Sequence, residues 1–143
     1  GGEQRGGGLG LSRYVRAEDG EAYERSFDGI LAVRCWRDLV DRGEIGDGEG
    51  EHELALAQLD RGLLRGLAAI VSARTSEVEA ATGVWSAAHW EVVRILGSVL
   101  DREARERDDA LAADLRAELD HDDAADADLA AIRSLLAAIF PCP

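Results

Sequence analysis

The feature that most constrains this chain is a helical stretch near its middle, in which apolar residues cover most of the helix surface. Two tryptophans, Trp85 and Trp90, stand at its start, and only a narrow polar stripe interrupts its apolar faces. A helix of this kind is typical of a bundle interior, because every apolar side needs a neighbour. The sequence therefore predicts a central buried helix, from Ser86 as its N-cap to about Arg105, with other helices around it. The apolar residues that recur along it are Ala88, Trp90, Val92, Val93, Ile95, Leu96, Val99 and Leu100.

Length and composition favour a globular protein. The 143 residues, 46% of them hydrophobic and 31% charged, are enough to bury one core. We therefore expect a single domain over residues 9–143, preceded by a flexible tail over the glycine-rich residues 1–8. The formal net charge of −13 repels nucleic acid phosphates and anionic lipids, so neither is an expected partner. No apolar run approaches the length of a membrane span.

The remaining pattern is helical throughout and predicts an all-α fold. Helices are expected over about 9–18, 21–43, 52–74, 76–83 and 108–120, with a last one halted by Pro141. Gly43 is placed to end the second helix, whereas Gly62 and Gly66 weaken the third and predict that it divides into two. Two lines of the second helix are expected to be buried, namely Phe27, Leu31, Cys35 and Leu39 on one and Ile30, Val33, Trp36 and Val40 on the next.

Several residues match patterns found at catalytic or metal sites. Glu49 with His52, and Glu118 with His121, have the Glu-x-x-His spacing of di-iron bundles. No further carboxylates complete either site on the apolar helices, so we predict no metal site and no cofactor. The aspartates of residues 120–128 lack the glycine and glutamate of a calcium loop, which makes them a helix cap.

Residues with nucleophilic or basic side chains are better explained by packing. His89 has no serine, cysteine or aspartate at an obvious partnering distance in the sequence, and Cys35 lies in an apolar helical stretch that predicts a core position. We therefore predict no catalytic residues and no enzyme. The contexts of Cys35 and Cys142 do not suggest a structural disulfide, which fits a reducing compartment.

Three segments, taken in order, are similar to the poxvirus Bcl-2-like proteins, and in particular to the small vaccinia virulence-factor branch. The first is Arg13-Tyr14-Val15, and the second is residues 37–45, with the sequence RDLVDRGEI. The third is residues 71–74, VSAR, followed by Trp90-Glu91 and the apolar run at 92–96, where that family has its central helix. The similarity covers about residues 12–120. It implies a Bcl-2-like helical bundle with a central buried helix.

The resemblance implies a non-enzymatic function in the host cytoplasm. Such proteins bind host signalling proteins to inhibit NF-κB and interferon signalling, or hold the death-motif helix of pro-apoptotic Bcl-2 proteins in a groove. Cellular relatives carry an arginine two residues after the tryptophan of the central helix, and here that residue is Val92. The sequence therefore favours inhibition of innate immune signalling, with inhibition of apoptosis as the alternative. A bacterial regulatory or metal-binding helical bundle is the second alternative.

Two sets of residues are candidates for partner contacts. A groove for a partner helix would be lined by Leu59, Leu63, Trp85, His89, Trp90 and Arg94, although core packing is the simpler role for the leucines and tryptophans. A homodimer interface, which the family suggests, would use Leu11, Tyr14 and Val15 of the first helix, unless these side chains pack inward.

Overall fold

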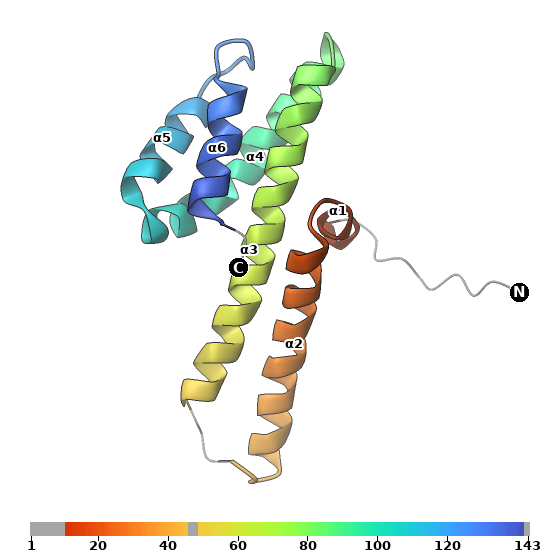
Figure 1. The fold of residues 1–143 in the computed structure, drawn as a ribbon, viewed down its shortest axis with the longest axis vertical. Coiled ribbons are helices and arrows are strands. Elements are labelled where there is room, and N and C mark those ends of the chain that lie inside the picture. The colour runs from red at the N-terminus through yellow and green to blue at the C-terminus, as the bar shows by residue number, and fades with distance from the viewer. Residues whose placement is uncertain (1–10, 46–48, 142–143) are drawn as a thin grey trace, which may run out of the picture. The chain divides into compact units, whose positions relative to one another are not determined.

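The computed structural model describes residues 11–45 and 49–141. Helices account for 84% of these residues and no strand occurs among them, which confirms the all-α prediction. Figure 1 shows the helices in chain order. Their bounds are α1 (Leu11–Glu18), α2 (Gly20–Asp41), α3 (Glu49–Ala80), α4 (Val84–Arg107), α5 (Asp109–Leu119) and α6 (Leu129–Ile139). Within the described ranges, no helix combines the length and the apolar character needed to cross a bilayer.

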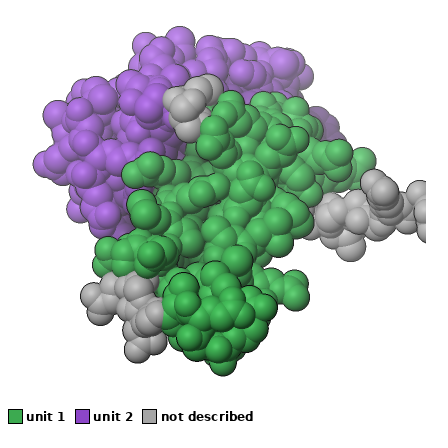
Figure 2. Space-filling model, turned by 60° about the horizontal axis from the view of Figure 1, so that its bottom comes forward, with its two compact units in different colours: residues 1–66 green, residues 67–143 purple. Residues whose placement is uncertain are grey.

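The chain divides into two compact units, residues 1–66 and 67–143, which Figure 2 distinguishes by colour. Unit 1 contains α1, α2 and the first part of α3, and unit 2 contains the rest of α3 with α4, α5 and α6. The single domain expected over 9–143 stays a prediction. The tail expected over 1–8 lies outside the described residues.

Both ends of α2 are fixed by local hydrogen bonds. Asp19 is the N-cap, and its Oδ1 accepts a hydrogen bond from the backbone N–H of Ala22 at 2.9 Å. At the other end, Gly43 has a φ of +67°, and its N–H donates to the carbonyl of Val40 at 2.9 Å. Glycine adopts this left-handed conformation without a Cβ penalty. The predicted role of Gly43 in ending the second helix is confirmed.

The α2 and α3 helices pack through small residues, which the sequence pattern did not predict. The buried residues of α2 are Ala22, Ser26 and Gly29. Because these positions recur at intervals of four and three, they form one narrow stripe that allows the two backbones to approach closely. The larger apolar residues then lie away from this stripe. The prediction that they are buried is wrong for Phe27, Ile30, Leu31 and Cys35, which are exposed.

Helix α3 is continuous, so the prediction that it divides near its glycines is wrong. Gly62 lies against the backbone of Ser26 on α2, and Gly66 lies against the side chain of Val15 on α1. Each glycine costs about 1 kcal/mol of helix propensity relative to alanine. We infer that the close packing of α1 and α2 on this helix offsets that cost.

Unit 2 has its own apolar core. Its most deeply buried large side chains are Trp90, Leu100, Ile132, Leu136 and Phe140. Helix α5 is in contact with both α4 and α6. Asp128 caps α6, with its Oδ1 accepting from the N–H of Ala131 at 2.9 Å, so the aspartate cluster does provide a helix cap.

The prediction that α4 is surrounded by other helices is wrong. Its buried residues form a single stripe, whereas Val92, Ile95 and Val99 are exposed. Helices α5 and α6 have only 11 residues each, against 24 in α4, and among the residues of unit 2 they leave this side of α4 uncovered. The helix also begins earlier than predicted. Its N-cap is Gly83, and Ser86 instead donates its hydroxyl hydrogen to the carbonyl of Val78 at 3.2 Å.

Candidate interaction surface on helix α4

Helix α4 carries two apolar stripes, of which only one is buried. The inner stripe consists of Trp90, Val93, Gly97, Leu100 and Ala104. The outer stripe consists of Trp85, Ala88, Val92, Ile95 and Val99, and all five are exposed. At 100° per residue, the two stripes lie about 140° apart around the helix. One stripe therefore stabilises the fold of unit 2, and the other is left toward solvent within that unit.

The outer stripe exposes large apolar side chains in a continuous row. Trp85 is 70% exposed, Ile95 62% and Val99 61%. Single exposed apolar residues are normal on a protein surface, but a contiguous row of them marks an interaction site. The five positions alternate at intervals of three and four residues, which is the spacing of a helix seam that packs against another helix. The geometry of this row is suited to a helical partner.

Trp90 of the inner stripe and Arg94, which lies away from the outer stripe, both donate hydrogen bonds within unit 2. The indole N–H of Trp90 donates to the carbonyl of His121 at 3.2 Å. The guanidinium of Arg94 donates through Nε to the carbonyl of Leu119 at 3.2 Å, and also contacts Glu91 and Asp122. Both donors therefore satisfy backbone carbonyls where α5 ends. They hold the connection from α5 to α6 against α4.

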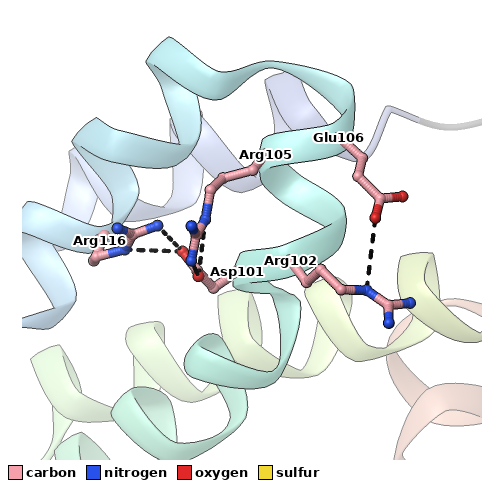
Figure 3. A network of polar contacts seen from close by, with 5 residues as sticks. All are labelled: Asp101, Arg102, Arg105, Glu106 and Arg116. Carbon is pink, nitrogen blue, oxygen red and sulfur yellow. Dashed lines mark hydrogen bonds and ion pairs between the residues drawn. The ribbon is translucent and has the colours of Figure 1, made fainter.

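The groove between α4 and α5 contains a charge network. Asp101 accepts hydrogen bonds from Arg105 (Nε–Oδ2 3.1 Å) and from Arg116 on α5 (Nε–Oδ1 2.9 Å). Figure 3 shows Asp101 between these two arginines, while Arg102 and Glu106 pair on another side of α4. The hydrogen bonds from Arg105 and then Arg116 lower the pKa of Asp101, against the opposing effect of its desolvation. The groove is about 400 Å³ in volume, and both Asp101 and Arg116 of this network line it.

The lowered pKa of Asp101 predicts a pH-dependent contribution to stability. The pKa of this carboxyl is lower in the folded state than its ordinary value of 3.8. The ionised carboxylate therefore stabilises the fold above pH 3.8, and this stabilisation is lost as the pH falls through the pKa of the folded state. We expect Asp101→Asn to lower the free energy of unfolding at pH 7 by on the order of 1 kcal/mol. The difference from the wild type should shrink below about pH 3.8, as measured by urea unfolding across that range.

Glu106→Gln is the matched control for this experiment. Glu106 also pairs with an arginine on α4, but at 3.6 Å and with both side chains more than half exposed. Exposed pairs of this kind contribute little, so the control should unfold almost as the wild type does. A loss in Asp101→Asn that does not change with pH would contradict the assigned role of the carboxylate.

The predicted groove residues are divided between the two units. Leu59 is half-buried and Leu63 exposed on the first part of α3, in unit 1. Trp90 is only 2% exposed, so the prediction that it packs in the core is confirmed. Trp85 is exposed, so the same prediction is wrong for Trp85. His89 is half-buried, with Nδ1 3.1 Å from Glu77 of α3. That these residues line a groove stays a prediction.

The predicted dimer face is only partly described. Val15 is buried, and a β-carbon added at Gly66 would lie 2.6 Å from its Cγ1, so this side chain packs inward onto α3. Val15 is therefore not available at an exposed dimer face. The side chains of Leu11 and Tyr14 lie outside the described part of the chain, so their role stays a prediction.

The other residues with potential chemistry are placed as follows. His52 stacks on Trp36, with ring centroids 4.1 Å apart, and Glu118 accepts a hydrogen bond from the backbone N–H of Asp128 at 2.7 Å. The side chain of Glu49 is not described. Cys35 is an exposed thiol, not the core residue that was expected. Among the residues with described placement, no group of three or more histidine, cysteine, aspartate or glutamate side chains is arranged to hold a metal ion.

Sequence reasoning missed the outer stripe because it assigned both apolar faces of α4 to the core. A signal was present in the sequence. Glu91 and Ser98, seven residues apart, separate Val92, Ile95 and Val99 from the inner stripe on one side. Two seams with alternating spacings of three and four were therefore visible, although nothing in the sequence said which one the chain buries.

Comparison with known proteins adds no family or structural relative. No protein-family model, no curated protein and no solved structure matches the chain.

Proposed function

We propose that this protein works by binding and not by catalysis, and that the outer stripe of α4 is its contact surface for an amphipathic helix. The observation that carries the proposal is the exposed row from Trp85 to Val99. Its alternating spacing allows the side chains of a second helix to fit between its own. Recognition of this kind gains its affinity from apolar anchors.

The test compares two identical substitutions. Ile95→Glu places a carboxylate in the middle of the stripe, where docking would bury it without a partner. Ile30→Glu makes the same change on α2, at a residue of comparable exposure (51% against 62%). We expect at least about a tenfold loss of affinity for bound amphipathic helices with Ile95→Glu and no loss with Ile30→Glu.

A suitable measurement is fluorescence anisotropy with a panel of labelled amphipathic peptides, including death-motif helices. Circular dichroism would confirm that both variants keep their helices. Two results would contradict the proposal that the outer stripe is a helix-docking surface. One is that no peptide binds at about 100 µM, and the other is that Ile95→Glu binds peptides as well as the wild type does.

A more specific form of the proposal follows from the resemblance to poxvirus Bcl-2-like proteins. In that form the chain is a Bcl-2-like protein, and the docked helix belongs to a host signalling or pro-apoptotic protein. Its support is the order of the three similar segments, which begin at Arg13, Arg37 and Val71. The burial of α4 along one stripe does not add to that support. Suppression of an NF-κB reporter that Ile95→Glu abolishes would favour signalling inhibition, and binding of death-motif peptides alone would favour inhibition of apoptosis.

A further inference from the structure

We propose that the helix docked on the outer stripe is α4 of a second copy of this chain, in antiparallel orientation about a twofold axis. The inference rests on the proposed function, because it names the partner of the same surface. Closed twofold dimers are the commonest protein oligomers, and their interfaces place the same surface of each copy against the other. The outer stripe must therefore be complementary to itself.

The order of residues along the stripe provides that complementarity. When Val92 is set opposite Ile95 of the second copy, antiparallel pairing sets Ala88 opposite Val99 of the second copy. The same register sets Trp85 opposite Arg102 of the second copy, since Arg102 continues the spacing by three residues beyond Val99. The twofold axis repeats each of these pairs. The result is four apolar layers, with a tryptophan–arginine layer at each end.

The two end layers carry the charge complementarity of the interface. Trp85 presents an exposed indole, and the side chain of Arg102 is 88% exposed and pairs with Glu106 at 3.6 Å. An arginine over an indole face is a favourable cation–π pair. A parallel arrangement would instead set Arg102 against its own copy, where like charges repel. The antiparallel register is therefore favoured.

The acidity of the chain is consistent with this choice of surface. At a net charge of −13, two copies repel each other over most approaches. None of the positions of the proposed seam, from Trp85 to Arg102, is acidic. The repulsion is therefore least where the two stripes meet, and added salt should strengthen the dimer by screening the remaining charge.

The size of the interface sets the expected affinity. The seam from residue 85 to residue 102 is about 26 Å long at 1.5 Å per residue. A standard stable interface buries about 800 Å² of surface on each partner, and two helices in contact over this length bury less than that. We therefore expect a reversible dimer with a dissociation constant on the order of 10 µM.

Sedimentation velocity from about 1 to 200 µM tests the dimer directly, because that range brackets the expected dissociation constant. The wild type should change from monomer to dimer over this range. Ile95→Glu should remain a monomer throughout, whereas Ile30→Glu should associate as the wild type does. A dimer that survives Ile95→Glu would overturn the proposed interface.

A charge reversal tests the end layers. Arg102→Glu should weaken the dimer at least fivefold, because it replaces the cation over Trp85 with an anion. Arg34→Glu is the matched control, since Arg34 is also exposed and also pairs with an acid four residues later, Asp38, at 3.8 Å. Equal effects of the two reversals would show that general charge, not the Trp85–Arg102 layer, controls association.

Orientation is tested by disulfide formation in a chain that also carries Cys35→Ser and Cys142→Ser. A mixture of the Val92→Cys and Ile95→Cys proteins should form the mixed disulfide dimer faster than either protein alone forms its own. Faster self-linkage of Val92→Cys would indicate parallel helices and would overturn the antiparallel register.

The second-copy inference and the helix-docking function have different signatures. Suppose that the wild type stays monomeric at about 200 µM, and that Ile95→Glu still abolishes binding of amphipathic peptides. This result would overturn the proposed homodimer but would support the proposed helix-docking function. A monomer that binds no helical peptide overturns both.

Discussion

Trp90→Ala is expected to lower the free energy of unfolding by about 4 kcal/mol, since it removes the largest fully buried side chain described in this protein. The cost has two parts. The apolar area of the indole is lost from the core, and the cavity that remains collapses only in part. The substitution also removes the N–H donor that the carbonyl of His121 accepts at 3.2 Å. Chemical unfolding followed by circular dichroism measures the loss.

Trp85→Ala is the matched control, because it makes the same substitution five residues earlier on the same helix. Its indole is 70% exposed, so its removal leaves no cavity, and we expect a change of less than about 0.5 kcal/mol. Both variants should be measured below 1 µM or so, where the proposed dimer would be dissociated. Equal losses in the two variants would contradict the division of α4 into an inner and an outer stripe.

A third substitution separates the two parts of the Trp90 effect. Trp90→Phe keeps most of the apolar volume but cannot donate to the His121 carbonyl. We expect it to cost about 1–2 kcal/mol, clearly less than alanine. If phenylalanine costs as much as alanine, the hydrogen bond and not the packing holds the connection from α5 to α6.

The local features of the fold were the predictable ones. Gly43 ends α2 and the aspartate cluster caps α6 as expected, the cap being Asp128, because each acts through backbone groups within a few residues of itself. The helix predicted over 108–120 is confirmed as α5 (Asp109–Leu119) for the same reason, since its N-cap, Asp108, accepts hydrogen bonds from the first N–H groups of that helix.

Which side of each helix is buried was not predictable, because that depends on residues far away in the sequence. In α2 the pattern favoured the large apolar residues, such as Phe27 and Leu31, whereas the helix packs through Ala22, Ser26 and Gly29. A pattern of apolar residues measures how much area each side would bury. It does not measure how close two backbones can come, which is what small residues control.

The candidate surface shows the same limit. The sequence shows that apolar residues cover most of the surface of α4. The prediction assigned the whole of that surface to the interior, because a pattern of apolar residues does not show which face of a helix the chain itself covers. The excess, Val92, Ile95 and Val99, is the part that unit 2 leaves exposed. Apolar residues beyond what the core can use are thus the sequence signal for an interaction site.

Gly29→Ala is expected to destabilise the protein by about 2 kcal/mol, although alanine is the better helix former. A β-carbon at this position would lie 2.6 Å from the Cα and 2.7 Å from the backbone nitrogen of Leu59 on α3. Backbone atoms cannot move aside as the end of a side chain can, so α2 and α3 must separate. The lost packing outweighs the gain of about 1 kcal/mol in helix propensity. Urea unfolding of the variant measures the net change.

Gly50→Ala is the control, since a β-carbon at this position of α3 meets no atom within 4 Å. It should leave the stability unchanged or raise it by a few tenths of a kcal/mol. Gly62→Ala should behave like Gly29→Ala, because its β-carbon would lie 2.7 Å from the backbone nitrogen of Ser26 on the facing helix. Both glycines permit the same close approach, so once one alanine has separated the helices, the second has less packing left to disrupt. The Gly29→Ala/Gly62→Ala double variant should therefore lose less stability than the two single losses added together. Fully additive losses would mean that the two glycines act at independent contacts, and that α2 and α3 do not pack as one glycine-mediated crossing.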